Sequence, residues 1–199
     1  MMSDLEVRRR LFHLVNGFIF TGLIYYNIVN WWIAGLIFLF CLGLGLIVKR
    51  YDVPFAFWFF EKFDRPKDFE TLPGKGSIFY MLGITLVLLL SEKVFFDKNI
   101  AIASILILAI GDSMAAIIGQ YGKIQHPFNS KKYMEGVIGG GILAAIAAAM
   151  FVSPLEAILA TVAAMILEGI DLKLGVNQLD DNLSMPLVAG LVIWLLRII

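Results

Sequence analysis

The sequence predicts an all-α, polytopic membrane protein, a bundle of about seven transmembrane helices with its N-terminus in the cytoplasm. Of its 199 residues, 60% are hydrophobic and 16% are charged, and the mean hydropathy is +0.85. Soluble domains contain about 45–50% apolar and about 25% charged residues. The apolar excess lies in runs long enough to cross a bilayer, and basic residues gather between alternate runs. We treat residues 1–199 as one integral membrane domain.

Seven apolar segments can each serve as a span, since about 20 apolar residues at a rise of about 1.5 Å cross the hydrocarbon core. They cover approximately 11–29, 31–48, 77–91, 99–119, 136–152, 154–168 and 184–199. Several are short, so a tilted or re-entrant path leaves a count of six open, although we prefer seven. The first segment follows Arg8–Arg10 without a small-residue cleavage site, which predicts a permanent span rather than a signal peptide.

The distribution of Lys and Arg supports seven spans. With that count, 13 of the 16 basic residues fall at the N-terminus and in the second, fourth and sixth loops, and the other 3 fall on the opposite side. The positive-inside rule then predicts that the rich side is cytoplasmic. The zero net charge gives no basic field for nucleic acid, and the single Cys41 excludes an internal disulfide or a Cys-rich metal site.

The longest loop, residues 49–76, contains an aromatic segment at 53–63 that is followed by charged residues. This composition favours an amphipathic helix lying in the membrane interface. Such a helix can pack on the bundle surface or form a route by which a lipid reaches the site, and both interpretations stay open.

Ionisable residues inside or beside the spans are few, and they lie toward the predicted cytoplasmic side. Asp112 lies about two turns from the cytoplasmic end of the fourth span, among the small residues Gly111, Ala115, Ala116 and Gly119. These small residues permit close approach of another helix or a ligand. Asp112 can serve helix packing alone, but a carboxylate inside a membrane is by default a functional candidate.

The next loop brings basic and acidic groups to the start of the fifth span, namely Asn129, Lys131, Lys132 and Glu135. The two lysines can be a topology signal only, or they can hold a phosphate as point charges. The carboxylate of Glu135 is suited to a Mg²⁺ ion that bridges phosphates.

The last cytoplasmic loop adds more oxygen ligands before the final span: Glu168, Asp171, Asp180, Asp181 and Asn182. Such hard ligands suit Mg²⁺. Either adjacent aspartate alone can be an N-cap of the last helix. With Asp112 and Glu135, however, the acidic group is larger than capping requires.

Two further features lie on the same face. Gly74, Lys75 and Gly76 open the third span, where free backbone N–H groups can bind an anion, although the Walker A spacing is missing. His13 and Asn16 share one face of the first helix, either as packing residues or as contacts to a substrate. This equipment is suited to aligning a nucleotide phosphate chain with a lipid head group.

At these positions the sequence resembles the CTP-dependent polyprenol kinase family, which includes dolichol kinases, phytol kinases and CTP-dependent diacylglycerol kinases. Four stretches carry the resemblance: Arg9–His13 matches R-[RK]-x-x-H, Gly111–Lys123 is similar to the family's Gly-Asp-rich helix, Lys132–Gly136 is similar to K-[ST]-x-E-G, and Glu168 with Asp181–Pro186 matches E…D-N-x-x-x-P. They cover most of the chain. Tyr133 departs from the pattern, because it stands where the family has Ser or Thr.

The resemblance implies a Mg²⁺-dependent kinase that transfers the γ-phosphate of CTP to the hydroxyl of a membrane isoprenoid alcohol such as dolichol or another polyprenol. Phytol, geranylgeraniol and diacylglycerol are the alternative acceptors. The implied roles are catalysis by Asp112, Lys132 and Glu135, nucleotide binding by Gly74, Lys75, Gly76, Asn129, Lys131 and Lys132, Mg²⁺ binding by Asp112, Glu135, Glu168, Asp181 and Asn182, and lipid binding by His13 and Asn16. Asp112 is the preferred general base because of its depth.

Two other classes of function stay open. A lipid-phosphate cytidylyltransferase would use the same metal and CTP but release pyrophosphate, and its C-terminal signature rich in Lys, Asp and Arg has no counterpart here. A transporter or a structural membrane protein would spread polar groups through the membrane depth, whereas here they lie at one end. Small-residue faces such as Gly136–Gly141 permit helix–helix association, including formation of a homo-oligomer.

Overall fold

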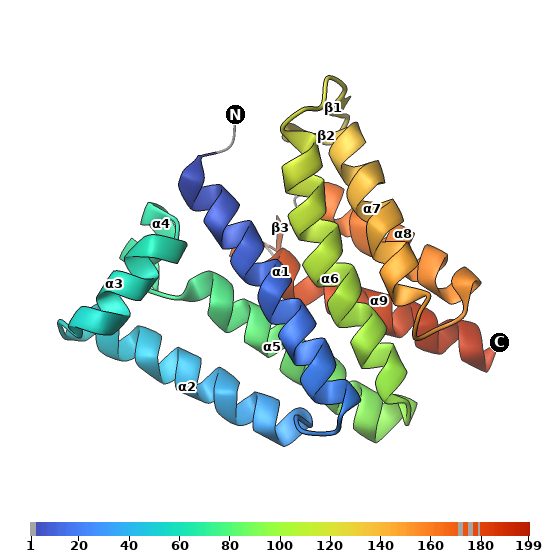
Figure 1. Ribbon diagram of the computed structural model, residues 1–199, viewed down its shortest axis with the longest axis horizontal. Coiled ribbons are helices and arrows are strands. Elements are labelled where there is room, and N and C mark those ends of the chain that lie inside the picture. The colour runs from blue at the N-terminus through green and yellow to red at the C-terminus, as the bar shows by residue number, and fades with distance from the viewer. Residues whose placement is uncertain (1–2, 171–172, 175–176, 179) are drawn as a thin grey trace.

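The computed structural model describes residues 3–170, 173–174, 177–178 and 180–199. Each of the seven predicted spans coincides with a helix in this part of the chain (Figure 1). The helices are α1 (Asp4–Tyr25), α2 (Trp31–Arg50), α5 (Lys75–Leu90), α6 (Lys98–Gly119), α7 (Met134–Ala148), α8 (Pro154–Gly169) and α9 (Asp181–Ile198). The prediction of an all-α protein is confirmed.

Shorter elements fill the connections between these helices. The helix expected at 53–63 is present as α3 (Pro54–Phe63), followed by α4 (Pro66–Thr71), and the π-helical turn η1 (Ser91–Phe95) extends α5. An antiparallel hairpin of β1 (Gln125–His126) and β2 (Asn129–Tyr133) precedes α7, and a second, of β3 (Lys173–Leu174) and β4 (Asn177–Gln178), precedes α9.

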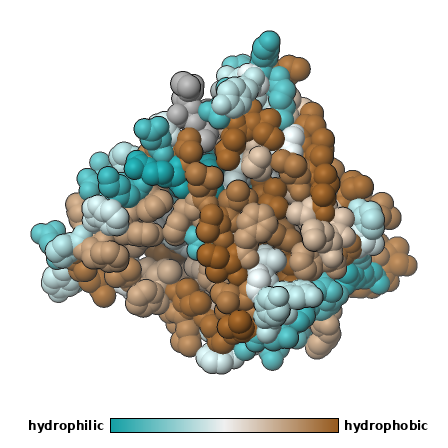
Figure 2. Space-filling model, in the orientation of Figure 1, coloured by the Kyte–Doolittle hydropathy of each residue, from teal (hydrophilic) through white to brown (hydrophobic). Residues whose placement is uncertain are grey.

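Four of the described helices are long and apolar enough to cross a membrane: α2, α5 with η1, α6 and α9. α7 is as apolar but shorter. Figure 2 shows a brown, hydrophobic surface between hydrophilic teal regions at the top and upper left and at the lower right. The protein is therefore a helical membrane protein, while seven crossings and a cytoplasmic N-terminus stay predictions.

Helix starts follow local capping signals. α8 opens with a capping box, in which the Ser153 hydroxyl accepts from the Glu156 amide and the Glu156 carboxylate accepts from the Ser153 amide. Pro154 lies in the first turn, where its missing N–H costs nothing. At the start of α2, the Asn30 side chain accepts from the Ile33 amide at 3.1 Å. These signals explain why the short connections predicted from sequence end where they do.

α6 is the central helix of the bundle. It is buried continuously from Ile100 to Ser113, packed by α1, α7 and α9 (Figure 1). A helix that is apolar on all sides is expected in such a position. The small residues at its end admit a helix, not a ligand: a Cβ added to Gly140 of α7 would lie 2.6 Å from the Ala115 nitrogen of α6. This close contact fixes the height of Asp112 in the bundle.

A second close contact positions the first turn of α9 against α5. A Cβ on Gly83 of α5 would collide with the backbone oxygen of Asn182 and lie 3.2 Å from Pro186. Proline has no N–H to donate to the carbonyl four residues earlier, so the Asn182 oxygen lacks its usual helical partner. The glycine leaves room for that oxygen and for the proline ring. The D-N-x-x-x-P sequence thus shapes the helix start that carries Asp181 and Asn182.

The charged groups gather at opposite ends of the bundle, because successive helices run in opposite directions and their connections lie at alternate ends. At one end Arg197 binds Glu156 at 2.6 Å and Asp97 at 2.5 Å, joining the C-terminus of α9 to the starts of α8 and α6. The starts of α1, α5 and α9 and the ends of α6 and α8 converge at the other end. The convergence expected from the distribution of charges is therefore present.

Candidate active site

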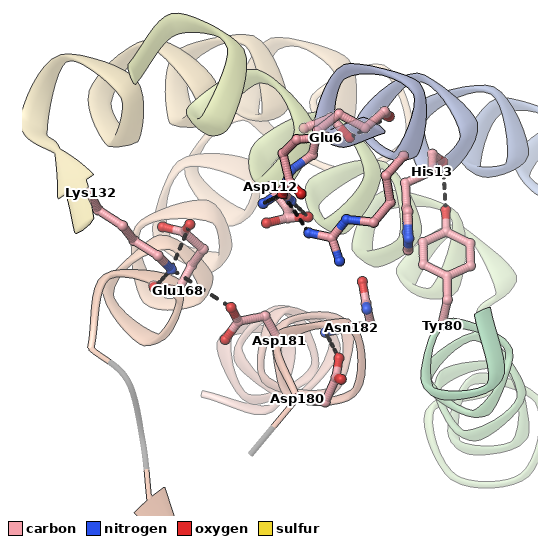
Figure 3. Close-up of polar contacts among 12 residues, drawn as sticks. Glu6, His13, Tyr80, Asp112, Lys132, Glu168, Asp180, Asp181 and Asn182 are labelled. Carbon is pink, nitrogen blue, oxygen red and sulfur yellow. Dashed lines mark hydrogen bonds and ion pairs between the residues drawn. The ribbon is translucent and has the colours of Figure 1, made fainter. Parts of the chain in front are cut away.

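A polar cavity of about 150 Å³ opens at the charged end of the bundle. Its walls come from α1, α4, α5, α6 and α9, and Figure 3 shows the polar side chains of the site. The lining residues are Arg9, Arg10, His13, Arg65, Asp68, Lys75, Gly76, Asp112, Asp180, Asp181 and Asn182. Four fixed cations and four aspartates therefore face one small volume.

An ion pair between Arg10 and Asp112 connects α1 to α6 at the side of the cavity. Both side chains are nearly buried, with 13% and 11% of their surface exposed. The hydroxyl of Ser113 also donates to the Arg10 backbone oxygen at 3.2 Å, which holds the two helices in register. A desolvated pair of this kind is costly to break from one side, because the remaining charge has no replacement for water.

Glu6 connects the first turns of α1 to the N-cap of α4 through an ion pair with Arg65. Its carboxylate lies 2.7 Å from Arg9, 3.4 Å from Arg10 and 2.8 Å from Arg65. One carboxylate therefore holds three guanidinium groups beside the cavity. Together with Lys75 they form a basic wall, whose planar guanidinium groups are suited to phosphate oxygens.

The start of α9 supplies the acidic wall. Asp180 is the N-cap and accepts from the Asn182 amide at 3.0 Å. Burial raises the pKa of Asp180, although this hydrogen bond opposes the shift. In Figure 3, Asp180, Asp181 and Asn182 project from one helix start. Asp180 thus caps α9 and lines the cavity at once, whereas the sequence offered a cap and a ligand as alternatives.

Lys132 joins the β1–β2 hairpin to the acidic wall. Its ammonium lies 2.8 Å from a Glu168 carboxylate oxygen and 3.7 Å from Asp181, and it also donates to the Glu168 backbone oxygen (Figure 3). Burial disfavours the charged ammonium, but the carboxylates of Glu168 and Asp181 outweigh it and raise the pKa of Lys132. Lys132 is therefore a protonated cation whose partners are carboxylates.

The donor set at this corner suits Mg²⁺. Glu168 Oε2 is buried and accepts no hydrogen bond from any described residue, so it is an oxygen ligand without a partner. Within the described ranges no three His, Cys, Asp or Glu side chains cluster closely enough to hold a metal by themselves. Mg²⁺ commonly takes only one or two carboxylates and completes its shell with water and substrate phosphates. Glu168 and Asp181, which share Lys132, fit that pattern.

Several residues predicted for the site lie elsewhere. The Glu135 carboxylate accepts from the backbone amides of Lys123 at 2.8 Å and Ile124 at 3.1 Å, which closes the turn after α6. Asn129 is buried in the hairpin, and neither residue is among those lining the polar cavity. The side chain of Lys131 lies outside the described residues, as does Asp171. Their predicted roles stay predictions.

Four residues of the cavity were absent from the predicted site: Arg9, Arg10, Arg65 and Asp68. Asp180, which the sequence offered both as an oxygen ligand and as an N-cap, also lines the cavity. A signal for two of the four exists in the sequence. Arg9 and Arg10 precede His13 by four and three residues, so all three share one helix face. Arg65 and Asp68 reach the site through the packing of the long loop, for which local spacing gives no indication.

A second, apolar cavity of about 280 Å³ adjoins the polar one. It is lined by residues of α1, α2, α3 and α5 and by Gly74. His13 lines both cavities, and Asn16 lines the apolar one. The Tyr80 hydroxyl donates to the His13 backbone oxygen at 3.2 Å, and the two rings meet edge to face at 4.9 Å. His13 is thus held at the boundary between charged and apolar space.

Asp64 fixes the loop that carries the glycine-rich start of α5. Its carboxylate accepts from the Gly74 amide at 2.5 Å, and Gly74 adopts φ +80°, a conformation that favours glycine. A Cβ there would also collide with the Phe60 ring. Burial raises the pKa of Asp64 to about 6, with the Gly74 amide opposing the shift. The charged form of this carboxylate is therefore disfavoured in the folded protein.

We expect Asp64→Asn to stabilise the protein at pH 8 by about 1–3 kcal/mol. With a folded pKa of about 6 against the ordinary 3.8, the neutral acid contributes stability below pH 4, and that contribution is lost as pH rises through 6. Asparagine keeps the acceptor for Gly74 without the charge. Thermal unfolding in detergent at pH 5 and pH 8 measures the difference, with the exposed Asp52→Asn as control. Equal shifts at both pH values would contradict the prediction.

Comparison with known proteins links the chain to lipid-alcohol kinases. Over 61% of its length it is 30% identical to a probable chloroplastic phytol kinase of Triticum aestivum, 30% identical to a chloroplastic farnesol kinase of Arabidopsis thaliana and 33% identical to a probable chloroplastic phytol kinase of Glycine max. The chain spans less than half the length of these kinases, between 43% and 45%.

A further relative matches nearly the whole chain. It is an uncharacterised protein of Methanocaldococcus jannaschii, 29% identical over 94% of this chain and 92% of its own length. No family model and no solved structure matches. The similarity to the named kinases supports a phytol- or polyprenol-kinase-like family and a kinase type of phosphotransferase.

Proposed function

We propose that the protein transfers the γ-phosphoryl group of CTP to the hydroxyl of a membrane isoprenoid alcohol. The observation that carries the proposal is the junction at His13 of a charged cavity and an apolar one. A kinase that transfers a phosphoryl group from a water-soluble nucleotide to a membrane lipid needs these two environments in contact. Cytidine as the base rests on the family resemblance alone.

The basic wall is suited to the phosphate chain of the donor. Arg9, Arg10 and Arg65 present planar donors, and Lys75 adds a point charge at the start of α5. The free amides of that helix start, with Gly76 in the cavity lining, favour an anion at the same position. In this proposal Arg9, Arg10, Arg65 and Lys75 share the phosphate binding that the sequence analysis gave to Lys131 and Lys132 of the hairpin.

The acidic wall, together with Glu168 at the end of α8, is suited to a divalent metal that travels with the nucleotide. Glu168, Asp181 and Asn182 would hold Mg²⁺, with Asp180 and Asp112 nearby. When bound, the metal would neutralise charge on the phosphates and help to align them. Before the nucleotide binds, the Lys132 ammonium would offset the electrostatic repulsion between the Glu168 and Asp181 carboxylates.

Asp112 is our candidate for the general base. It would accept the proton of the alcohol as that oxygen forms its bond to the γ-phosphorus and the bond to the leaving CDP oxygen breaks. In the structure Arg10 forms an ion pair with the Asp112 carboxylate. An incoming phosphate would compete for the Arg10 guanidinium, so donor binding would release Asp112 for the acceptor hydroxyl.

Named relatives favour a particular class of acceptor. Two are described as phytol kinases and one as a farnesol kinase, and both names denote isoprenoid alcohols. We therefore rank phytol, farnesol and geranylgeraniol above dolichol-length polyprenols, and those above diacylglycerol. This order reverses the preference drawn from sequence, in which the long polyprenol came first.

The proposal is tested by phosphate transfer with purified protein in detergent. CTP or ATP labelled at the γ-phosphate is supplied with Mg²⁺ and farnesol, phytol, geranylgeraniol, a long polyprenol, diacylglycerol or phosphatidic acid. We expect label on an isoprenoid alcohol, with CTP as the better donor. Pyrophosphate release with phosphatidic acid would instead establish a cytidylyltransferase, and absence of transfer with every pair would contradict both.

A further inference from the structure

We propose that the apolar cavity beside His13 binds the hydroxyl-proximal isoprenoid segment of the acceptor and that the chain enters it sideways from the bilayer past α2. This inference rests on the proposed function and adds to it a site, a direction of entry and a determinant of acceptor choice. The cavity is lined by Phe12, His13, Asn16, Phe20, Ile37, Phe40, Cys41, Leu44, Phe59, Phe60, Gly74, Ser77, Ile78, Tyr80 and Met81.

The shape of the bundle explains why a cavity exists here. α1 and α2 diverge from their connection at residues 26–30, and α3 lies across their open side (Figure 1). α2 packs mainly against α5 and has few contacts with other helices, so only a small part of its surface is buried. The space between the diverging helices is thus bounded by aromatic and aliphatic side chains on every element that lines it.

The mouth of the cavity faces the surface that a membrane would cover. Phe40 lines the cavity, yet 69% of its surface is exposed, so it belongs to the wall and to the outer face of α2 at once. Phe20, Tyr80 and Met81 are buried and form the opposite, inner side. An apolar chain could therefore enter past Phe40 without crossing water.

The inner end of the cavity supplies the polar contact that an alcohol requires. His13 is only 7% exposed and separates the apolar space from the cavity that contains Asp112 and Arg10. The Asn16 amide is held by its bond to the Phe12 backbone oxygen at 2.7 Å, which fixes the same helix face. Pockets for small molecules are mostly apolar with a few polar groups that set orientation. A hydroxyl at His13 would point toward the charged cavity.

The single cysteine of the chain reports on this cavity directly. Cys41 is the only thiol in the sequence and lies in the cavity wall, one residue after Phe40. We expect methyl methanethiosulfonate to modify Cys41 in the empty protein and farnesol to slow the reaction at least tenfold, as followed by mass spectrometry. Farnesane, the hydrocarbon without the hydroxyl, should protect much less. An unreactive Cys41, no protection by farnesol, or equal protection by farnesane would overturn the proposal.

A matched pair of tryptophan variants tests the cavity through the acceptor. Leu44 lines it, whereas Leu46 on the same helix is 54% exposed and lies outside its lining. Leu44→Trp should raise KM for farnesol at least tenfold and leave KM for CTP unchanged, while Leu46→Trp should change neither. Equal behaviour of the two variants would exclude the cavity as the acceptor site.

The two tests separate this inference from the proposed function. Protection of Cys41 requires no turnover, so a protein that binds farnesol but transfers no phosphate would retain the lipid site and contradict the kinase. Conversely, farnesol phosphorylation with an unprotected Cys41 and a normal Leu44→Trp enzyme would retain the kinase and contradict this site.

Discussion

Replacing Asp112 by asparagine is expected to lower kcat for phosphoryl transfer by about 10²–10⁴-fold, the usual range for loss of a general base. Asparagine keeps the size of the side chain and an oxygen that can accept from Arg10, but it cannot take the proton of the alcohol. KM for CTP should change little, because the basic wall remains. Steady-state kinetics with farnesol or phytol as acceptor measure both constants.

Alanine at this position would be a poorer test. Removing Asp112 altogether leaves Arg10 buried without its partner, a change that commonly costs about 3–5 kcal/mol. Loss of activity would then be confounded with loss of folding. The matched control is Ser104→Ala at a buried position of the same helix, where the serine hydroxyl donates to the Ile100 oxygen within α6; this variant should stay active. An Asp112→Asn enzyme retaining more than a tenth of the activity would exclude Asp112 as the base.

The helices could be predicted from the sequence because each apolar run is continuous and each break contains a turn or capping residue. The ends of the helices could not be predicted where polar residues continue a helix beyond its apolar run. α1 begins at Asp4 rather than near residue 11, since its first turns are held by Glu6 and its arginine partners. Whether all seven helices cross a membrane depends on their length and composition, and among the described helices four are long and apolar enough to do so.

The site was predictable in part for a similar reason. Asp112 and Asp181 stand out because carboxylates beside apolar helices are rare, and both line the polar cavity. The pairing of Arg10 with Asp112 joins residues 102 positions apart, and no local pattern reveals it. Glu135 shows the converse: it fits a motif, yet its carboxylate is engaged by the backbone amides of residues 123 and 124, which only the folded turn brings to it.

Lys132→Met should have the second large effect, on stability and activity together. Glu168 has only 5% of its side chain exposed, and the variant would lack the ammonium that lies 2.8 Å from Glu168 and 3.7 Å from Asp181. Breaking a buried ion pair from one side commonly costs about 3–5 kcal/mol, and loss of a positioned cation should lower kcat/KM by about 10²–10³-fold. Thermal unfolding and kinetics, each at several Mg²⁺ concentrations, measure the two effects.

Comparison of variants separates the two roles of this lysine. Lys132→Arg should retain most of the stability, because the cation is preserved, and the exposed Lys123→Met should change neither quantity. If Glu168 and Asp181 bind Mg²⁺, the ion should raise the melting temperature of Lys132→Met more than that of the unmodified protein, since it replaces the missing charge. A Lys132→Met protein as stable as the original at low Mg²⁺ would mean that the carboxylates are already neutral, and the metal-binding role assigned to them would fail with it.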